Sequence, residues 1–116
     1  MGRPHYDLAA WQETMRLARA TYEITRSFPK EEIYGLSAQM RRAAVSVPSN
    51  IAEGAARTGR KEFAQFLGIA KGSLSELETQ LLLAADLGYV TRDNEAFGLA
   101  ERVARLLTGL HKKALS

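Results

Sequence analysis

Basic side chains gather in one segment of the chain, between residues 41 and 61. This segment holds five cations and a single acid, Glu53, while the remainder of the chain is close to charge balance. Lysine and arginine neutralise the phosphates of nucleic acids, so a local excess of this kind indicates RNA or DNA binding. Twin basic residues on a helix are also common on solvated surfaces. The candidate phosphate-contacting residues are Arg41, Arg42, Arg57, Arg60 and Lys61.

Mild polar residues occupy the same segment. At about 100° per residue they align along one side of a helix, opposite its apolar side. A simple solvent-facing side would carry lysine and glutamate, whereas this one carries mostly serine, glutamine and asparagine. We interpret it as a half-buried hydrogen-bonded row or a contact surface, facing either a neighbouring subunit or nucleic acid. The row comprises Gln39, Ser46, Asn50 and Glu53.

One pair of residues could support enzymatic chemistry. Arg105 and His111 stand six positions apart, a spacing that resembles the Arg-x(4–6)-His motif of HEPN-type ribonucleases. In such a site the histidine acts in proton transfer and the arginine stabilises the strained phosphate. That family usually has a polar residue directly after the arginine, where this chain has Leu106. We therefore expect no enzymatic activity and keep the ribonuclease as an alternative.

Other site chemistries lack their residues. The chain has no cysteine, which excludes disulfides, thiolate zinc sites and cysteine nucleophiles. Di-iron sites in helical bundles need Glu-x-x-His pairs, but the residue three before His111 is Thr108, and the other histidine is His5. No nucleophile elbow or phosphate-binding glycine loop is present. We expect no metal and no cofactor.

Length and composition predict one soluble domain. The chain has 116 residues, of which 46% are hydrophobic and 25% charged, with a net charge of +3. A domain of this size buries roughly two-thirds of its unfolded surface, which is enough for one core. No apolar run approaches the length that spans a membrane, and the first residues lack the apolar core of a secretory signal. We expect a cytoplasmic protein without membrane contact.

Four apolar stripes predict helices over about 7–27, 36–56, 60–87 and 92–114. Asp7 and Ser37 are expected N-caps, and Gly35 and Gly88 are expected to adopt the left-handed conformation. In the first helix, a row of Ala10, Leu17 and Ile24 flanks the expected core stripe. That expected stripe consists of Leu8, Trp11, Met15, Ala18, Tyr22 and Thr25.

Pro48 lies inside the second predicted helix. It has no amide hydrogen to donate to the carbonyl of Ala44, and its ring crowds that carbonyl. Either one kinked helix continues through it, or a new helix begins with Pro48 in its first turn. The apolar register of Met40, Val47 and Ile51 is unbroken across the proline. This continuity favours the kink.

The third predicted helix has the most regular apolar pattern. Gly68 and Gly72 interrupt it, and we expect another backbone to approach closely there. Four such helices with short connections predict an all-α, up-down-up-down antiparallel bundle in one domain, residues 1–116. Surplus apolar rows on the first and third helices would face water, which favours self-association. The regular stripe is Phe63, Leu67, Ala70, Leu74, Leu77, Leu81 and Ala84.

Several strings of the sequence resemble a known family. Together with Trp11, they are FPKEEIYGL, QMRRAAVSVPSNIAEGAAR and EFAQFLGIAKGSLSELETQLLLAADLGY. They resemble the four-helix-bundle proteins encoded within intervening sequences of bacterial 23S ribosomal RNA genes, over about residues 7 to 90. The accessory variability determinant of diversity-generating retroelements looks similar too.

The resemblance implies a bundle that assembles into a ring-like homopentamer. For the accessory determinant it implies a basic barrel that binds nucleic acid and a reverse transcriptase. The positions that match a basic surface are Arg41, Arg42 and Arg57, with Arg60 and Lys61 as neighbours.

Three hypotheses follow from the sequence. The first is a non-enzymatic homo-oligomer that binds RNA or DNA through phosphate contacts, without strong sequence preference. The second is a protein-interaction scaffold, for example for a reverse transcriptase, that binds no nucleic acid. The third is the ribonuclease with Arg105 and His111.

Overall fold

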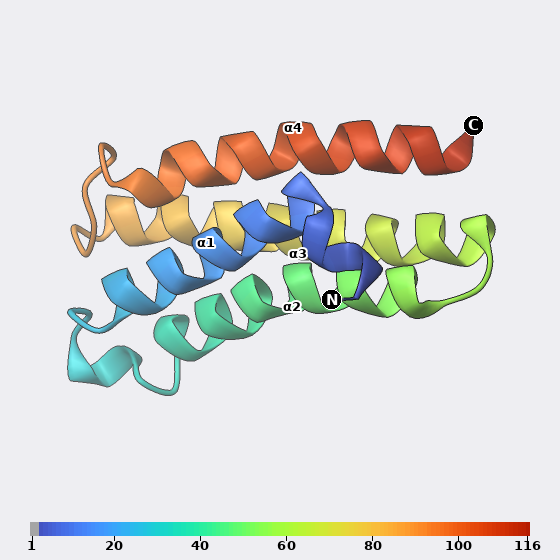
Figure 1. Ribbon diagram of the computed structural model, residues 1–116. Helices are drawn as coiled ribbons and strands as arrows, with labels where there is room; N and C mark the ends of the chain where they lie inside the picture. The colour runs from blue at the N-terminus through green and yellow to red at the C-terminus, as the bar shows by residue number, and fades with distance from the viewer. Residues whose placement is uncertain (1–2) are drawn as a thin grey trace.

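The computed structural model describes residues 3–116, which contain four long helices and no strand. The helices are α1 (Ala9–Thr25), α2 (Leu36–Ala56), α3 (Arg60–Asp86) and α4 (Glu95–Leu115), as Figure 1 shows. Single 3₁₀ turns, Pro4–Asp7 and Lys30–Glu32, precede α1 and α2. The predicted helices all exist, and their ends differ from prediction by at most three residues.

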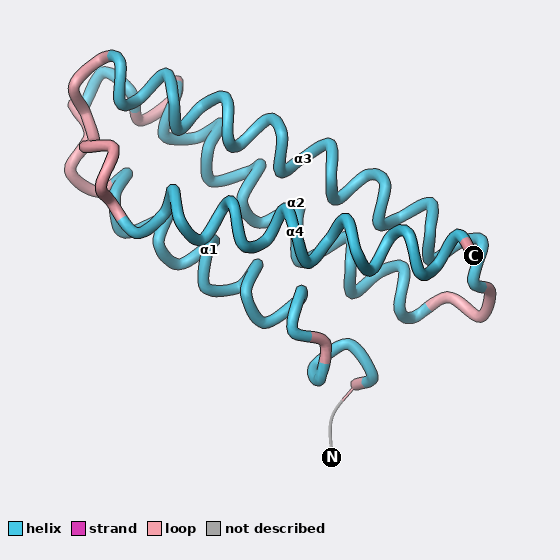
Figure 2. The backbone as a smooth tube through the Cα atoms, turned by 90° about the horizontal axis from the view of Figure 1, so that it is seen from above, coloured by secondary structure: helices cyan, strands magenta, loops and turns pink. Residues whose placement is uncertain are grey.

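The four helices stand at the corners of a square. Each packs against the helices before and after it along the chain, and α4 closes the square against α1. In Figure 2, viewed from above, α4 lies over α2 with α1 and α3 on either side. Short connections make consecutive helices antiparallel, which confirms the predicted all-α bundle.

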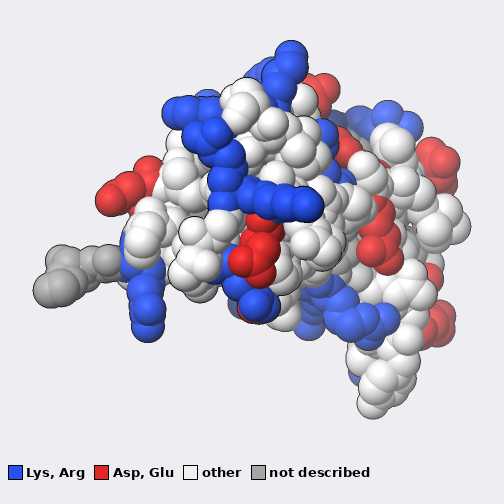
Figure 3. Space-filling view, turned by 90° about the vertical axis from the view of Figure 1, so that its right-hand side faces the viewer, with Lys and Arg blue, Asp and Glu red and all other residues white. Residues whose placement is uncertain are grey.

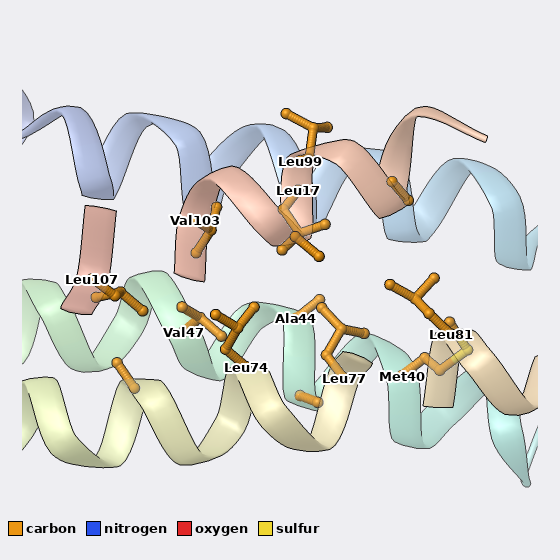
Figure 4. Close-up of a cluster of buried hydrophobic side chains, with 14 of the residues drawn as sticks. Leu17, Met40, Ala44, Val47, Leu74, Leu77, Leu81, Leu99, Val103 and Leu107 are labelled. Carbon is orange, nitrogen blue, oxygen red and sulfur yellow. The ribbon is translucent and has the colours of Figure 1, made fainter. Parts of the chain in front are cut away.

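The core is a column of aliphatic side chains that all four helices supply. Figure 4 shows Leu17 of α1, Val47 of α2, Leu77 of α3 and Val103 of α4 pointing toward one another. All four are at most 1% exposed. Full burial of one such side chain contributes about 1.5–3 kcal/mol relative to its exposure. The predicted α3 stripe is confirmed from Leu67 through Ala84.

The predicted core stripe of α1 is confirmed at Thr25 and wrong at its other positions, which are at most half-buried. The flanking row, Ala10, Leu17 and Ile24, lies in the core, whereas Trp11 is half-buried and Tyr22 is exposed. Threonines share the buried face because their hydroxyls donate to carbonyls of their own helix, which satisfies them without water. The bonds are Thr14 to Trp11 (2.7 Å), Thr21 to Leu17 (2.8 Å) and Thr25 to Thr21 (2.8 Å).

Helix α2 continues through Pro48, as the apolar register predicts. In Figure 1, α2 bends near its middle. The bend follows from the proline ring, which separates two hydrogen-bonded halves of the helix. Pro48 itself is buried.

The starts of α1 and α2 are closed by residues other than those predicted. Asp7 is not the N-cap of α1. Leu8 holds that position, and no side-chain hydrogen bond caps the helix there. Gly35 has a φ of −111° and is the N-cap of α2, so neither a left-handed Gly35 nor a Ser37 cap is found. The Glu32 carboxylate instead accepts a hydrogen bond from the Leu36 amide at 3.1 Å.

The α3–α4 connection has its own closing residues. Gly88 has the predicted left-handed backbone, with a φ of 81°. Asn94 caps α4, because its side-chain oxygen accepts from the Ala96 amide at 2.9 Å. Tyr89 donates its hydroxyl to Glu32 at 2.9 Å, which ties this connection to the start of α2.

Close helix approach occurs at Gly54 and not at the two glycines predicted. A Cβ at Gly54 would lie 2.7 Å from the Phe66 Cβ and 3.0 Å from the Phe63 Cδ1. At Gly68 the nearest neighbour is the His111 ring at 3.7 Å, and nothing lies within 4 Å of Gly72. The glycine that α2 and α3 need for close packing is therefore in the α2 sequence.

Candidate nucleic-acid interface

The five predicted phosphate-contacting residues fall into two separate groups. Arg41 and Arg42 lie in the first half of α2, and Arg57, Arg60 and Lys61 lie at its end and the start of α3. Sixteen residues separate Arg41 from Arg57, which along a helix is about 24 Å. The residues do not form one site.

In the first group, only Arg42 is freely exposed. The Arg41 guanidinium is half-buried; it donates to the Thr25 hydroxyl at 2.8 Å and lies 4.6 Å from the centre of the Tyr22 ring. These contacts fix α2 to the end of α1. Arg42 lines a shallow groove of about 570 Å³, whose rim also carries the acidic Glu76.

The predicted polar row is largely a link between α2 and α3. The Ser46 hydroxyl lies 2.8 Å from the Ser73 hydroxyl, and the Asn50 amide donates to the Ser46 carbonyl (2.8 Å) and hydroxyl (3.0 Å). Gln39 is exposed and takes no part. Sequence inspection missed Ser73, which the antiparallel register of α2 and α3 places opposite Ser46.

The second group lies at the end of the bundle where α2 turns into α3. The Arg57 guanidinium pairs with Glu53 at 2.9 Å and lies 5.1 Å from the centre of the Phe66 ring. The Arg60 guanidinium donates to the backbone oxygen of Ser116 at 2.7 Å, and Lys61 is exposed. Both lie where α3 begins.

The end of α4 adds further cations at the same place. Because α3 and α4 are antiparallel, Lys112 and Lys113 come beside the start of α3, and both are exposed. We call these residues, Arg57, Arg60, Lys61, Lys112 and Lys113, the basic end. Figure 3 views this end, and lysine and arginine atoms cover several parts of it, with acidic atoms between them.

Two grooves open between the helices of the basic end. One, of about 430 Å³, has an apolar floor of Leu8, Phe63 and Leu110, with Arg57 and Lys113 among its lining residues. The other, of about 800 Å³, lies between α3 and α4 and is lined by residues that include Lys61 and His111. We call the second the α3/α4 groove. None of its described lining residues is acidic.

The ribonuclease pair is not assembled. Six residues on a helix rotate by about 600°, so Arg105 and His111 leave α4 in directions about 120° apart. His111 lies against α3, with its Nδ1 3.5 Å from the Lys71 ammonium, whereas Arg105 is exposed. The contact of His111 with Lys71 was not predicted from the sequence, because the two residues lie 40 positions apart in the chain.

Two ionisable groups, both outside the basic end, have displaced pKa values. Burial, and then the nearby Glu101 carboxylate, raises the pKa of Glu78 on α3. The pKa of Tyr89 is also raised, first by the hydrogen bond that its hydroxyl donates to Glu32 and then by burial.

Among residues 3–116 no group of three or more potential ligands is placed to hold a metal ion. In the same part of the chain, none of the helices combines the length and apolarity needed to cross a bilayer.

Comparison with known proteins identifies a family and a similar fold. The family described as 23S rRNA-intervening sequence protein matches residues 6–109. A crystal structure of a protein of unknown function from the S23 ribosomal protein family of Bacteroides thetaiotaomicron VPI-5482 is similar, with a TM-score of 0.66 and 22% identity. The match covers 92% of this chain and 95% of that one, and at this identity it shows the fold alone. No curated protein matches.

Proposed function

The chain belongs to the 23S rRNA-intervening sequence protein family, and from the geometry of its basic end we propose that it is a non-enzymatic, homo-oligomeric bundle that binds RNA or DNA. The observation that carries the proposal is the convergence of α2, α3 and α4. It puts five cations at one end of the molecule, against Glu53, which is paired with Arg57, and the exposed Glu62. Such a surface attracts the nucleic-acid backbone.

The expected binding has little sequence preference. Lysine and arginine contacts to phosphates set the position of a strand but carry no base information. The amide and hydroxyl groups of the polar row, which could read bases, are partly used: Ser46 and Asn50 bond to each other, and Ser46 also to Ser73. Arg42 offers one further exposed cation, about 22 Å along α2 from Arg57.

Self-association is supported by uncovered apolar surface on different sides of the bundle. Between α1 and α2, a groove of about 730 Å³ is lined by residues that include Trp11 and Val45. On α3, Ile69, Leu82 and Leu83 are between 43% and 48% exposed. Contact between two different surfaces of identical chains is heterologous and closes into a ring when the rotation allows it. A ring of five copies is the assembly that the family resemblance implies.

A charge-reversal experiment tests the nucleic-acid proposal. The double variant Arg60→Glu/Lys61→Glu reverses charge at the basic end, and Lys30→Glu/Arg92→Glu changes the net charge equally at the opposite end. Binding of fluorescently labelled single-stranded RNA and DNA is followed by anisotropy in low salt. We expect the first variant to bind at least tenfold more weakly and the second to bind within a few-fold of the wild type.

Equal weakening by both variants would mean that net charge, and not the basic end, governs binding. If the wild type binds neither RNA nor DNA in low salt, the nucleic-acid proposal fails. The apolar groove between α1 and α2 then favours the protein-interaction scaffold.

A further inference from the structure

The α3/α4 groove extends beyond the basic end and brings His111 close to Arg60 and Lys61. Its floor is formed by small residues, Ala64, Gly68 and Ala114, which leave the groove open. Arg60 and Lys61 lie at one end of it, and His111 lies over Gly68, where a Cβ would be 3.7 Å from the imidazole Nε2. The groove therefore reaches from the start of α3 to the imidazole.

Lys71 contacts one nitrogen of the His111 imidazole. Its ammonium lies 3.5 Å from Nδ1 of His111, and an ammonium has donors only. When Nδ1 accepts in this contact, the ring proton is on Nε2, the nitrogen that lies near Gly68. Both side chains are half-buried, and Lys71 has no ion pair among residues 3–116. One imidazole nitrogen can satisfy only one of the three ammonium protons.

The groove thus combines a floor of small apolar residues with positive charge and hydrogen-bond donors, and no carboxylate lines it. Lys61 supplies one cation, and Arg60 supplies another, although its guanidinium also donates to the Ser116 backbone oxygen. His111 supplies an imidazole donor when its Nδ1 accepts from Lys71. An oxyanion with several acceptor oxygens is the ligand that such an arrangement recognises, and phosphate has this chemistry. A volume of about 800 Å³ accommodates more than one phosphate, so a nucleotide unit of a strand fits as well.

We propose that the α3/α4 groove is a phosphate subsite, in which the imidazole of His111, oriented by Lys71, contacts a backbone phosphate of a bound strand. This inference rests on the proposed nucleic-acid binding and adds the path that a bound strand follows on the protein. A strand crossing Arg60 and Lys61 continues along the groove between α3 and α4. His111 is a binding residue here, and Lys71 is the residue that positions it.

Substitutions at the two residues separate this subsite from the rest of the basic end. His111→Leu removes the Nε2 donor and keeps an apolar side chain, while His111→Gln retains an amide donor. Lys71→Met removes the ammonium and keeps a long side chain. We expect His111→Leu and Lys71→Met to weaken binding of a labelled single-stranded RNA by about five- to tenfold, and His111→Gln to weaken it less. Circular dichroism melting verifies that each variant remains folded.

Nuclear magnetic resonance of the imidazole rings gives a second test that needs no substitution. The chain has two histidines, and His5 packs against Tyr6 and Trp11 away from the groove, so it is an internal control. We expect the ring resonances of His111 to shift on addition of the RNA while those of His5 do not. Inorganic phosphate, and the same strand with uncharged methylphosphonate linkages, are added in separate titrations.

The outcomes distinguish the subsite from the proposed function. If inorganic phosphate shifts His111 as strongly as the strand does, at equal phosphate concentration, the subsite binds free phosphate and the strand course is wrong. If the uncharged strand shifts His111 equally, phosphate recognition is wrong. RNA binding that depends on Arg60 and Lys61 but leaves the ring resonances of His111 unshifted would refute the subsite. The proposed binding at the basic end would then remain supported. If no RNA binds at all, both proposals fall.

Discussion

Replacement of Gly54 by alanine tests how α2 and α3 come together. The added Cβ would lie 2.7 Å from the Phe66 Cβ and 3.0 Å from the Phe63 Cδ1. The Phe66 Cβ is attached directly to the α3 backbone, so rotation of a side chain cannot remove the contact. Relief requires that the two helices separate at this level, which loosens the packing that positions Arg57 and Arg60.

Two opposing effects set the size of the change. Alanine in place of glycine stabilises a helix interior by about 1 kcal/mol. Overpacking of a close interface costs about 1–3 kcal/mol, and the contact here is at the tight end of that range. We expect Gly54→Ala to lower the free energy of unfolding by about 1–2 kcal/mol. Gly109→Ala in α4 is the matched control; nothing lies within 4 Å of its Cβ, so it gains up to about 1 kcal/mol.

Urea unfolding followed by circular dichroism measures both variants at one protein concentration, because self-association would shift the midpoint. For a domain of this size 1 kcal/mol corresponds to about 4 °C in Tm, so the two variants should differ by roughly 4–12 °C in thermal melting. If Gly54→Ala is as stable as Gly109→Ala, the close approach of α2 and α3 is not as tight as described, and the reasoning is refuted.

Three further predictions concern stability. Because the pKa of Glu78 is raised, its ionisation weakens the fold as pH rises through its folded-state pKa, which lies above 4.5. Glu78→Gln should therefore raise Tm at pH 7 and leave it nearly unchanged at pH 3; an equal effect at both pH values would contradict the raised pKa that burial and then Glu101 cause. The raised pKa of Tyr89 means that its contribution is present below pH 10.0 and is lost as pH rises through the folded-state value. Tyr89→Phe should thus destabilise the protein at pH 8 more than at pH 11 in urea unfolding. Leu77→Ala, at a site with no exposed surface, should lower the free energy of unfolding by about 2–5 kcal/mol by the same measurement, and a loss below 1 kcal/mol would place Leu77 outside the core.

Apolar periodicity predicted the architecture where large aliphatic residues repeat without competitors. The α3 stripe from Leu67 to Ala84 is the clearest case, and the register across Pro48 correctly predicted one continuous α2. The same reasoning failed in α1, where the row with alternating spacings of three and four was predicted as the core stripe in place of Ala10, Leu17 and Ile24. Threonines complete the buried face of α1, and an apolar pattern does not count them, because their hydroxyls are satisfied by carbonyls of their own helix.

The sequence predicted only those parts of the candidate site whose residues are close together along the chain. Arg57, Arg60 and Lys61 lie within five positions, so their proximity follows from local sequence. The partnership of Lys71 with His111 joins residues 40 positions apart and depends on the register of α3 against α4. Conversely, Arg41 and Arg57 share a helix but not a site, because a helix separates residues by about 1.5 Å per position.

The salt dependence of RNA binding tests most directly whether the basic end contacts phosphates. Dissociation constants for a labelled single-stranded RNA are measured between about 50 and 200 mM salt for the wild type and for Arg60→Glu/Lys61→Glu. About four phosphate contacts predict a slope of log affinity against log salt near −3 for the wild type, and a slope nearer to zero for the variant. A wild-type slope close to zero, or an unchanged slope in the variant, would contradict phosphate binding at the basic end.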